Sequence, residues 1–174
     1  MEFLSTRRLV LRNFLPEDLQ RVVAYRNREA CNRYQRWEAF TPEAVAEFIA
    51  RFQQDVFLSE QEEQHYAIAL SENGQLVGDL AYFFTPGDCV TLGITISDSH
   101  HRRGFARELL TACIARIRQT YRSLDIVALI EPENKASVGL FEALGFTLEC
   151  YAEKIQSLVY VLPPSKEKEN EKEM

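Results

Sequence analysis

The chain contains 174 residues, of which 46% are hydrophobic, so it can bury one substantial core, and its composition gives no sign of a second domain. Its formal net charge of −6 and its pI near 5.2 argue against a general binder of nucleic acids, whose affinity rests largely on a positive field, and suit a cationic or amine-bearing partner. The four cysteines include no Cys-x-x-Cys pair and the three histidines are not spaced with them as ligands, so we expect no metal site.

No run of the sequence approaches the ~18 apolar residues that a membrane span needs. The start of the chain also lacks the basic residues and apolar core of a signal peptide. We therefore expect a soluble cytoplasmic protein with reduced thiols and no membrane partner.

The first predicted elements are a strand and two helices. Residues 8–14 alternate well enough for a strand. Pro16 then begins a helix whose apolar side chains recur at helical spacing to residue 26. Residues 27–40 are irregular and rich in arginine and aromatic residues. A second helix follows, because Thr41 is a preferred N-cap residue and Pro42 suits the first helical position.

Three strands come next and predict an antiparallel meander. Residues 65–70 and 75–84 are joined by a turn that contains Asn73 and Gly74, which is a strong hairpin signal. A third strand over residues 89–96 follows the turn at residues 85–88.

The second half of the chain predicts two further helices and three strands. One helix opens at Gly104 and shows an apolar face to residue 117, and residues 124–130 form the apolar run typical of a strand at the centre of a sheet. Residues 135–144 predict a helix that Gly145 ends, and residues 146–151 and 155–162 predict a hairpin. This order indicates a mixed α/β fold with one domain over residues 1–162 and a charged, solvated tail over residues 163–174.

A polar, basic turn at residues 98–103 runs directly into the helix that opens at Gly104. The first N–H groups of a helix have no partner inside it, and the helix dipole leaves a partial positive charge there, so this turn can hold an anion. Gly104 would let the backbone approach the anion closely. The competing interpretation is an ordinary helix start whose arginines are solvated.

Two segments carry a resemblance to a known family. One reads His101-Arg102-Arg103-Gly104-Phe105-Ala106, and the other is the helix that starts with Asn134-Lys135-Ala136-Ser137 and ends with Gly145-Phe146. The first resembles the cofactor motif Gln/Arg-x-x-Gly-x-Gly/Ala of the GNAT superfamily of N-acetyltransferases, with its first position substituted. The second resembles that family's Asn-x-x-Ser/Ala helix.

The start of the chain extends this resemblance to about residues 5–162. It reads Thr6-Arg7-Arg8-Leu9-Val10-Leu11-Arg12 followed by Pro16-Glu17-Asp18. It is similar to the start of the branch that includes ribosomal-protein N-terminal (alanine/serine) acetyltransferases. The resemblance implies a twisted, mostly antiparallel sheet of about seven strands with a central splayed parallel pair, and about four helices. It also implies transfer of the acetyl group of acetyl-CoA, without a metal, to a primary amine on a small molecule or at a peptide or protein N-terminus.

The resemblance assigns the basic turn to CoA. Backbone N–H groups from Arg102 to Ala106 would hold the pyrophosphate, and Arg102, Arg103 and Arg107 would add charge-assisted contacts. His101 would donate to a phosphate or help to hold the loop.

The strand before the turn receives the pantetheine arm in the same interpretation. The backbone of Ile94, Thr95 and Ile96 would pair with it as a neighbouring strand would, and a backbone N–H would stabilise the charge on the thioester oxygen.

Asn134 and Ser137 are the candidate polar residues of the second motif. By resemblance Asn134 would bind pantetheine and Ser137 would face the departing sulfur. Each has an alternative, because Asn134 is also a suitable N-cap for its own helix and Ser137 can simply contact the backbone.

The proton chemistry departs from the family pattern. Phe141 stands where many members have a tyrosine as general acid, and Thr91 stands near the position of their glutamate base. A water chain that ends on a carboxylate near a strand end (Asp79, Glu131 or Glu133), or an acceptor amine whose pKa is already about 7 to 8, would suffice in place of the base. His65 and Tyr82 could line the same cleft, and each of these five residues has a structural or solvated role as its alternative. Trp37 and Tyr82 are the candidate acceptor-binding residues, with Trp37 as a core aromatic in the competing interpretation.

Two other functions remain open from the sequence. A CoA-binding sensor that has lost turnover would explain Phe141 and Thr91. A nucleotide-binding protein would use the same loop, but the Gly-x-x-x-x-Gly-Lys-Ser/Thr pattern is absent. A homodimer through a sheet edge is compatible with the resemblance.

Overall fold

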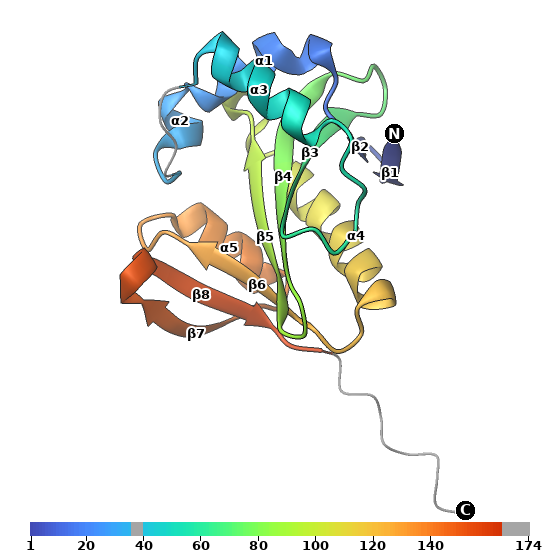
Figure 1. Cartoon of the computed structure of the whole chain (residues 1–174). Helices are drawn as coiled ribbons and strands as arrows, with labels where there is room; N and C mark the ends of the chain where they lie inside the picture. The colour runs from blue at the N-terminus through green and yellow to red at the C-terminus, as the bar shows by residue number, and fades with distance from the viewer. Residues whose placement is uncertain (36–39, 165–174) are drawn as a thin grey trace, which may run out of the picture.

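One twisted sheet of eight strands organises the computed structural model, which describes residues 1–35 and 40–164 (Figure 1). The strand order is β1-β2-β3-β4-β5-β6-β8-β7, and all neighbours are antiparallel except β5 and β6. The strands are β1 (Glu2–Ser5), β2 (Leu9–Arg12), β3 (Glu63–Leu70), β4 (Leu76–Thr85), β5 (Cys89–Ile96), β6 (Asp125–Ile130), β7 (Thr147–Ala152) and β8 (Ser157–Leu162).

Five α-helices and three single-turn 3-10 helices connect the strands within the described ranges. The α-helices are α1 (Leu19–Arg26), α2 (Glu29–Asn32), α3 (Pro42–Phe52), α4 (Phe105–Thr120) and α5 (Lys135–Ala143). Strand β1 and helix α2 add to the seven strands and four helices expected from the sequence. Both have only four residues, which is too short for a periodic pattern to indicate them.

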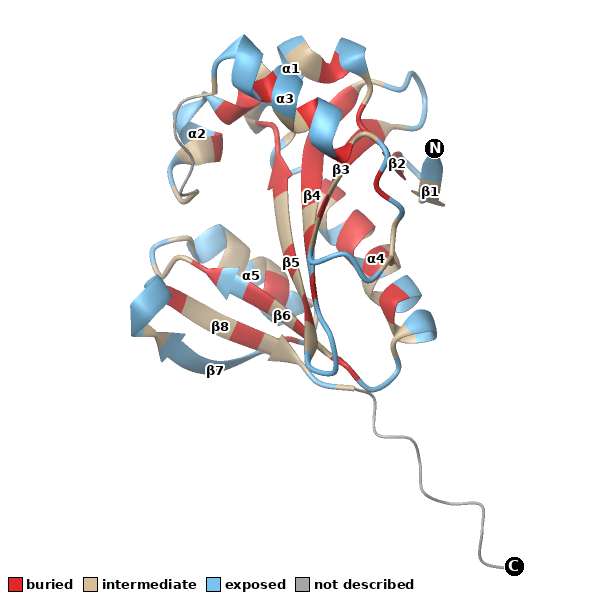
Figure 2. Ribbon diagram, viewed as in Figure 1, coloured by how far each residue is buried: buried red, intermediate tan, exposed pale blue. Residues whose placement is uncertain are grey.

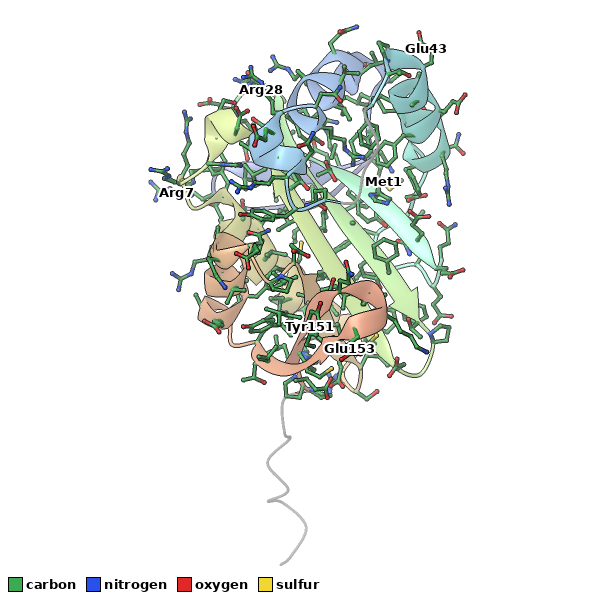
Figure 3. All side chains as sticks on the ribbon, turned by 90° about the vertical axis from the view of Figure 1, so that its left-hand side faces the viewer. Met1, Arg7, Arg28, Glu43, Tyr151 and Glu153 are labelled. Atoms are coloured by element: carbon green, nitrogen blue, oxygen red, sulfur yellow. The ribbon has the colours of Figure 1, made fainter. Side chains whose placement is uncertain are left out.

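The helices cover opposite faces of the sheet because neighbouring strand residues point to opposite sides. Tyr66 and Ile68 of β3 belong to the core under α4, whereas Ala67 between them belongs to the core under α1 and α3. Figure 2 shows both cores along the centre of the sheet, and strand β7 exposed at its edge. The side chains of Tyr151 and Glu153 lie at this β7 end of the molecule, opposite Glu43 of α3 (Figure 3).

One helix start is fixed by a local cap and another by contacts between distant parts of the chain. The Thr41 hydroxyl accepts a hydrogen bond from the Ala44 N–H at 3.2 Å and begins α3. The first turn of α4 is held by the carboxylate of Glu108, which accepts from the hydroxyl of Thr6 at 2.6 Å and from the backbone N–H and Nε of Arg8 at 2.8 and 2.7 Å. The segment between β1 and β2 is thereby tied to the start of α4.

Gly78 of β4 is required by the close approach of β5. A Cβ atom placed there would lie 2.1 Å from the carbonyl oxygen of Thr95. We therefore expect Gly78→Ala to lower the free energy of unfolding by about 1–3 kcal/mol or more, since the β4–β5 ladder must open. Gly139 of α5 is the matched control, because its added Cβ would meet nothing within 4 Å. Gly139→Ala should stabilise by about 0.5–1 kcal/mol, and urea unfolding that ranked the two variants the other way would contradict this account.

Candidate functional site

The parallel strands β5 and β6 separate part of the way along their length. They pair only over Cys89–Thr91 and Asp125–Val127, after which β6 keeps its partner β8 and β5 keeps its partner β4. Figure 1 shows β6 running away from β5 beyond this point. The edge of β5 from Leu92 to Ile96 therefore faces β6 without a strand partner, and its backbone groups on that edge can pair with a ligand.

The basic turn after β5 presents a run of free amides. The N–H groups of residues 102–107 make no hydrogen bond within the described part of the chain. Arg102 and Gly104 have positive φ angles of 58° and 76°, and Gly104 is the residue before the first turn of α4. Successive amides in such a turn form a concave anion-binding surface, which the positive end of α4 reinforces.

His101 holds this turn in place. Its Nε2 donates to the carbonyl oxygen of Ile96 at 2.7 Å, so the ring ties the turn to the end of β5. Of the two roles considered for His101, the structure therefore shows the loop-holding one. The same bond occupies the Ile96 carbonyl. The Ser97 N–H donates to the Val77 carbonyl beside β4 at 2.8 Å, and successive residues of a strand turn their backbone groups to opposite edges, so those of Thr95 face β4 and not a ligand, contrary to expectation. Ile94 is left as the main candidate for pairing with an extended ligand.

A first cavity of about 570 Å³ lies between this turn, β5, α2 and α5. Its described lining includes the basic side chains of Arg102 and Arg107 together with His100 and His101, and it includes no carboxylate. The cavity is thus suited to an anionic ligand. Burial and the neighbouring Arg103 and Arg21 lower the pKa of His100 below its ordinary value, so His100 adds little to the positive charge of the arginines near neutral pH.

A second cavity of about 530 Å³ lies on the sheet beside the first. Side chains that point to one face of three adjacent strands form its floor: Glu63 and His65 of β3, Asp79, Ala81 and Phe83 of β4, and Thr91, Gly93 and Thr95 of β5. Glu131, at the start of the loop after β6, adds a third carboxylate. No lysine or arginine belongs to the described lining, so this cavity is suited to a cation.

The two cavities share a wall where β5 and β6 separate. The residues that line both are Tyr34, Gln35, Ile94, Thr95, Asn134 and Ser137. A ligand in the basic cavity can therefore meet a ligand in the acidic cavity at this wall.

Asn134 and Ser137 lie at this wall and keep polar groups available. The Asn134 Oδ1 accepts from the Ser137 N–H at 3.1 Å, so Asn134 does cap its helix. Its Nδ2 and the Ser137 hydroxyl make no hydrogen bond among the described residues, so both can still contact a ligand. The backbone contact considered for the Ser137 hydroxyl is therefore not present.

The structure separates the three arginines that we had grouped at the anion site. Arg102 and Arg107 line the first cavity, whereas Arg103 lines a third cavity of about 550 Å³ with Arg7 and Arg8. The reason is the left-handed backbone at Arg102, which turns neighbouring side chains of the loop to different sides.

Of the two residues expected to bind an acceptor, Tyr82 does not face the second cavity. Tyr82 is 0% exposed and packs under α4, because Ala81 and Phe83 on either side of it face the second cavity. The structure therefore corrects its assignment to the acceptor site. Trp37 lies outside the described residues. Phe141 and Thr91, where acid and base groups were missing from the sequence, both line the second cavity.

Asp79 is held in a buried cluster that the sequence did not indicate. Its carboxylate pairs with the Arg26 guanidinium at 2.9 Å and accepts a hydrogen bond from the Tyr25 hydroxyl, and all three side chains are nearly inaccessible to solvent. The guanidinium also stacks over Phe48 at 4.3 Å. Asp79 is thus committed to an ion pair with α1, while Glu131 makes no ion pair in the described structure.

Among the described residues, no group of three or more histidine, cysteine or acidic side chains is arranged to hold a metal ion. None of the described helices combines the length and apolar character required to cross a membrane.

Comparison with known proteins identifies the same family along most of the chain. Residues 8–147 match the acetyltransferase (GNAT) domain. An uncharacterised N-acetyltransferase of Bacillus licheniformis, p20, is 26% identical over 151 residues, which cover 86% of this chain and 84% of that protein.

Solved structures share the fold. The ribosomal-protein-S5-alanine acetyltransferase of Vibrio fischeri has a TM-score of 0.73 at 16% identity, over 95% of this chain and 98% of that one. The spermidine N-acetyltransferase of Vibrio cholerae, solved with CoA and spermine, has a TM-score of 0.70 at 18% identity, over 88% and 92%. These likenesses confirm the mixed α/β fold with its splayed parallel pair.

The buried ion pair predicts a large difference between two carboxylates of the second cavity. Asp79→Asn should lower the free energy of unfolding by about 3–5 kcal/mol, because it leaves the Arg26 charge buried without its carboxylate partner. Glu131→Gln should change it by no more than about 0.5 kcal/mol. Equal losses in denaturant titrations of the two variants would show that the Asp79–Arg26 pair does not stabilise the fold.

Proposed function

The chain belongs to the acetyltransferase (GNAT) family, and from this premise we propose that it transfers the acetyl group of acetyl-CoA to a primary amine by direct attack in a ternary complex. The observation that carries the proposal is the pair of cavities with opposite charge that share a wall at the β5–β6 separation. An anionic acyl donor and a cationic acceptor need such a pair, with the reacting atoms at the shared wall.

The first cavity is proposed to hold the acyl donor. The amides of residues 102–107 and the side chains of Arg102 and Arg107 match a pyrophosphate in number and charge. The unpaired edge of β5 at Ile94 matches the amides of the pantetheine arm. The Nδ2 of Asn134 is a further donor to that arm, and the Ser137 hydroxyl is positioned to face the sulfur.

The reaction requires little from side chains beyond positioning and removal of a proton. Acetyl-CoA supplies an activated acyl group whose thiolate, with a thiol pKa of about 8.5, leaves without prior protonation. A backbone N–H on the free edge of β5 can stabilise the charge on the thioester oxygen. The absence of a hydroxyl on Phe141 is therefore compatible with turnover, and the main chemical task is to deprotonate the acceptor ammonium.

The second cavity is proposed to hold the amine. Its carboxylates favour a cationic acceptor, and the acceptors considered are the α-amine of a peptide or protein, a small amine such as a polyamine or amino acid, and an aminoglycoside-like antibiotic. The Vibrio neighbours illustrate the first two, since one is named for alanine of a ribosomal protein and the other was solved with spermine.

The same proposal covers the extent of the domain, its cellular location and its assembly. We propose one catalytic domain over residues 1–162, acting in the cytoplasm, where the described cysteines, all unpaired, would stay reduced. The exposed strand β7 at the sheet edge offers a surface for a homodimer.

The deciding experiment is a titration with acetyl-CoA followed by a screen of amines and N-terminal peptides. We expect saturable binding of acetyl-CoA, competition by CoA but not by ATP, and steady release of CoA with at least one acceptor. Tight CoA binding without turnover on any acceptor would instead favour a CoA-binding sensor, which Thr91 and Phe141 in the acceptor cavity make the second candidate. Failure to bind acetyl-CoA would refute both.

Arg107 and Arg103 lie in different cavities, so charge reversal at each gives a matched test of where the phosphates of acetyl-CoA bind. Arg107→Glu should raise the Kd for acetyl-CoA about 10–100-fold, because a contact with a charged phosphate is lost and a like charge replaces it. Arg103→Glu makes the same change of net charge but acts from the third cavity, so its effect should be only a few-fold at physiological ionic strength. Isothermal titration of both variants measures this, and equal Kd values would move the phosphate site away from the first cavity.

A further inference from the structure

The acceptor cavity contains one side chain whose protonation state suits proton removal, His65 of β3. His65 pairs with Ala81 of β4, and Ala81 pairs with Gly93 of β5, so the three residues form one row across the sheet on the cavity face. Neighbouring strands are about 4.8 Å apart, which places the Cα atoms of His65 and Gly93 about 10 Å from each other. Ala81 and Gly93 are small, so no large side chain of this row stands between His65 and the place where β5 and β6 separate.

The ring of His65 is held in one tautomer. Its Nε2 lies 3.1 Å from Oε1 of Glu63, and the other oxygen of Glu63 pairs with Arg51 of α3 at 2.8 Å. A carboxylate only accepts, so Nε2 carries the hydrogen and Nδ1 of the neutral ring is an acceptor. The backbone N–H of His65 is fixed as well, since it donates to Asp55 at 3.0 Å.

The Nδ1 atom lacks the donor that it requires. It has almost no accessible surface and no hydrogen-bond partner in the described structure, although His65 lines the second cavity, so a ligand reaches Nδ1 after a small displacement of the ring or of the side chains around it. Buried polar atoms are rarely left in this state, and an exception at a cavity calls for a ligand. Since Nδ1 accepts and the cavity favours cations, an ammonium N–H is the donor that fits both conditions.

The surroundings keep the ring neutral near pH 7. The rings of Phe48, Phe52 and Phe83 pack around it with centroids at 5.0, 4.5 and 6.1 Å, and burial lowers the pKa of His65 below its ordinary value. The charged groups that act on the ring are Glu63 on β3, Asp79 on β4, Arg26 on α1, Arg51 on α3 and Asp55 after α3.

We propose that His65, oriented by Glu63, binds the acceptor ammonium through Nδ1 and removes its proton, directly or through one water molecule. This assignment rests on the proposed function, because it assumes that the amine enters the second cavity. His65 is then the catalytic base, Glu63 is the residue that positions it, and neither Thr91 nor a carboxylate of the cavity is needed for that step.

The proton balance of the step is simple. The ammonium transfers one proton to Nδ1, and the resulting amine attacks the thioester carbon. An N–C bond forms, the C–S bond breaks, and the second proton of the attacking nitrogen passes to the departing sulfur. The products are the N-acetyl amine and CoA, and the imidazolium returns its proton to solvent.

The main test is His65→Gln, with an alanine-initiated peptide and spermine as acceptor probes. Its kcat at pH 7 should fall by about 10²–10⁴-fold, with the KM for acetyl-CoA changed less than about twofold. Protonation of His65 abolishes the base, and because burial lowers its pKa, wild-type kcat/KM should fall only at a pH below the ordinary histidine pKa of about 6.5. His65→Gln should lack that limb, and its defect should shrink as pH approaches the pKa of the acceptor, where the amine arrives unprotonated.

Two further variants guard against a merely structural effect. Glu63→Gln should lower kcat about tenfold, because the tautomer is held less firmly, whereas Glu62→Gln removes an exposed neighbouring charge and should leave kcat unchanged. If wild type acetylates a probe and His65→Gln retains its rate and pH profile, the base assignment is wrong while the proposed function stands.

A spectroscopic measurement tests the assignment without turnover. The ¹⁵N shifts of the His65 ring in the resting protein should show hydrogen on Nε2 and a free Nδ1, and saturating spermine should shift the Nδ1 resonance. A ring protonated at Nδ1, or an Nδ1 resonance that ignores spermine, would overturn the proposal even if neither probe is acetylated.

Discussion

The early end of the β5–β6 pairing is the constraint on which the rest of the site depends. Three residues of each strand pair in parallel, and beyond Thr91 and Val127 the two strands follow different partners. Unpaired backbone groups at the centre of a sheet are costly unless something else meets them. Here the separation leaves an edge of β5 in the middle of the molecule, and the anion-binding turn, α5 and both cavities are arranged around it.

The basic and acidic residues of the site lie in different cavities. The protein is acidic as a whole, yet the cavity beside α4 is lined by Arg102 and Arg107 and the cavity on the sheet by Glu63, Asp79 and Glu131. Asp79 is paired with Arg26 in the interior and Glu63 with the exposed Arg51, so Glu131 is the carboxylate of this cavity that has no ion pair among the described residues. Only the shared wall, which contains Asn134 and Ser137, is uncharged.

Sequence patterns predicted the elements and the anion-binding turn because both depend on neighbours in the chain. The Thr41 and Asn134 caps, the strands and the turn before Gly104 are local signals, and each is present in the structure. Tyr82 could not be placed from sequence, because both faces of β4 are covered and alternation does not say which faces the cavity. The Arg26–Asp79 pair joins residues 53 positions apart, and the choice between Arg102 and Arg103 depends on a left-handed backbone angle that no local pattern announces.

The hydrogen bonds from Thr6 and Arg8 to Glu108 affect the free energy with which an anion binds at the turn before α4. Three donors form hydrogen bonds with this carboxylate in the first turn of α4. Its negative charge therefore repels an anion bound at the neighbouring turn only weakly. Burial raises the pKa of Glu108, but the hydrogen bonds from Thr6 and Arg8 outweigh it and keep the group ionised, so the tie persists in mildly acidic solution. Together with the bond from His101 to Ile96, this tie orders the turn and the start of α4 when the polypeptide folds, so association with a diphosphate should proceed with little further ordering of the backbone.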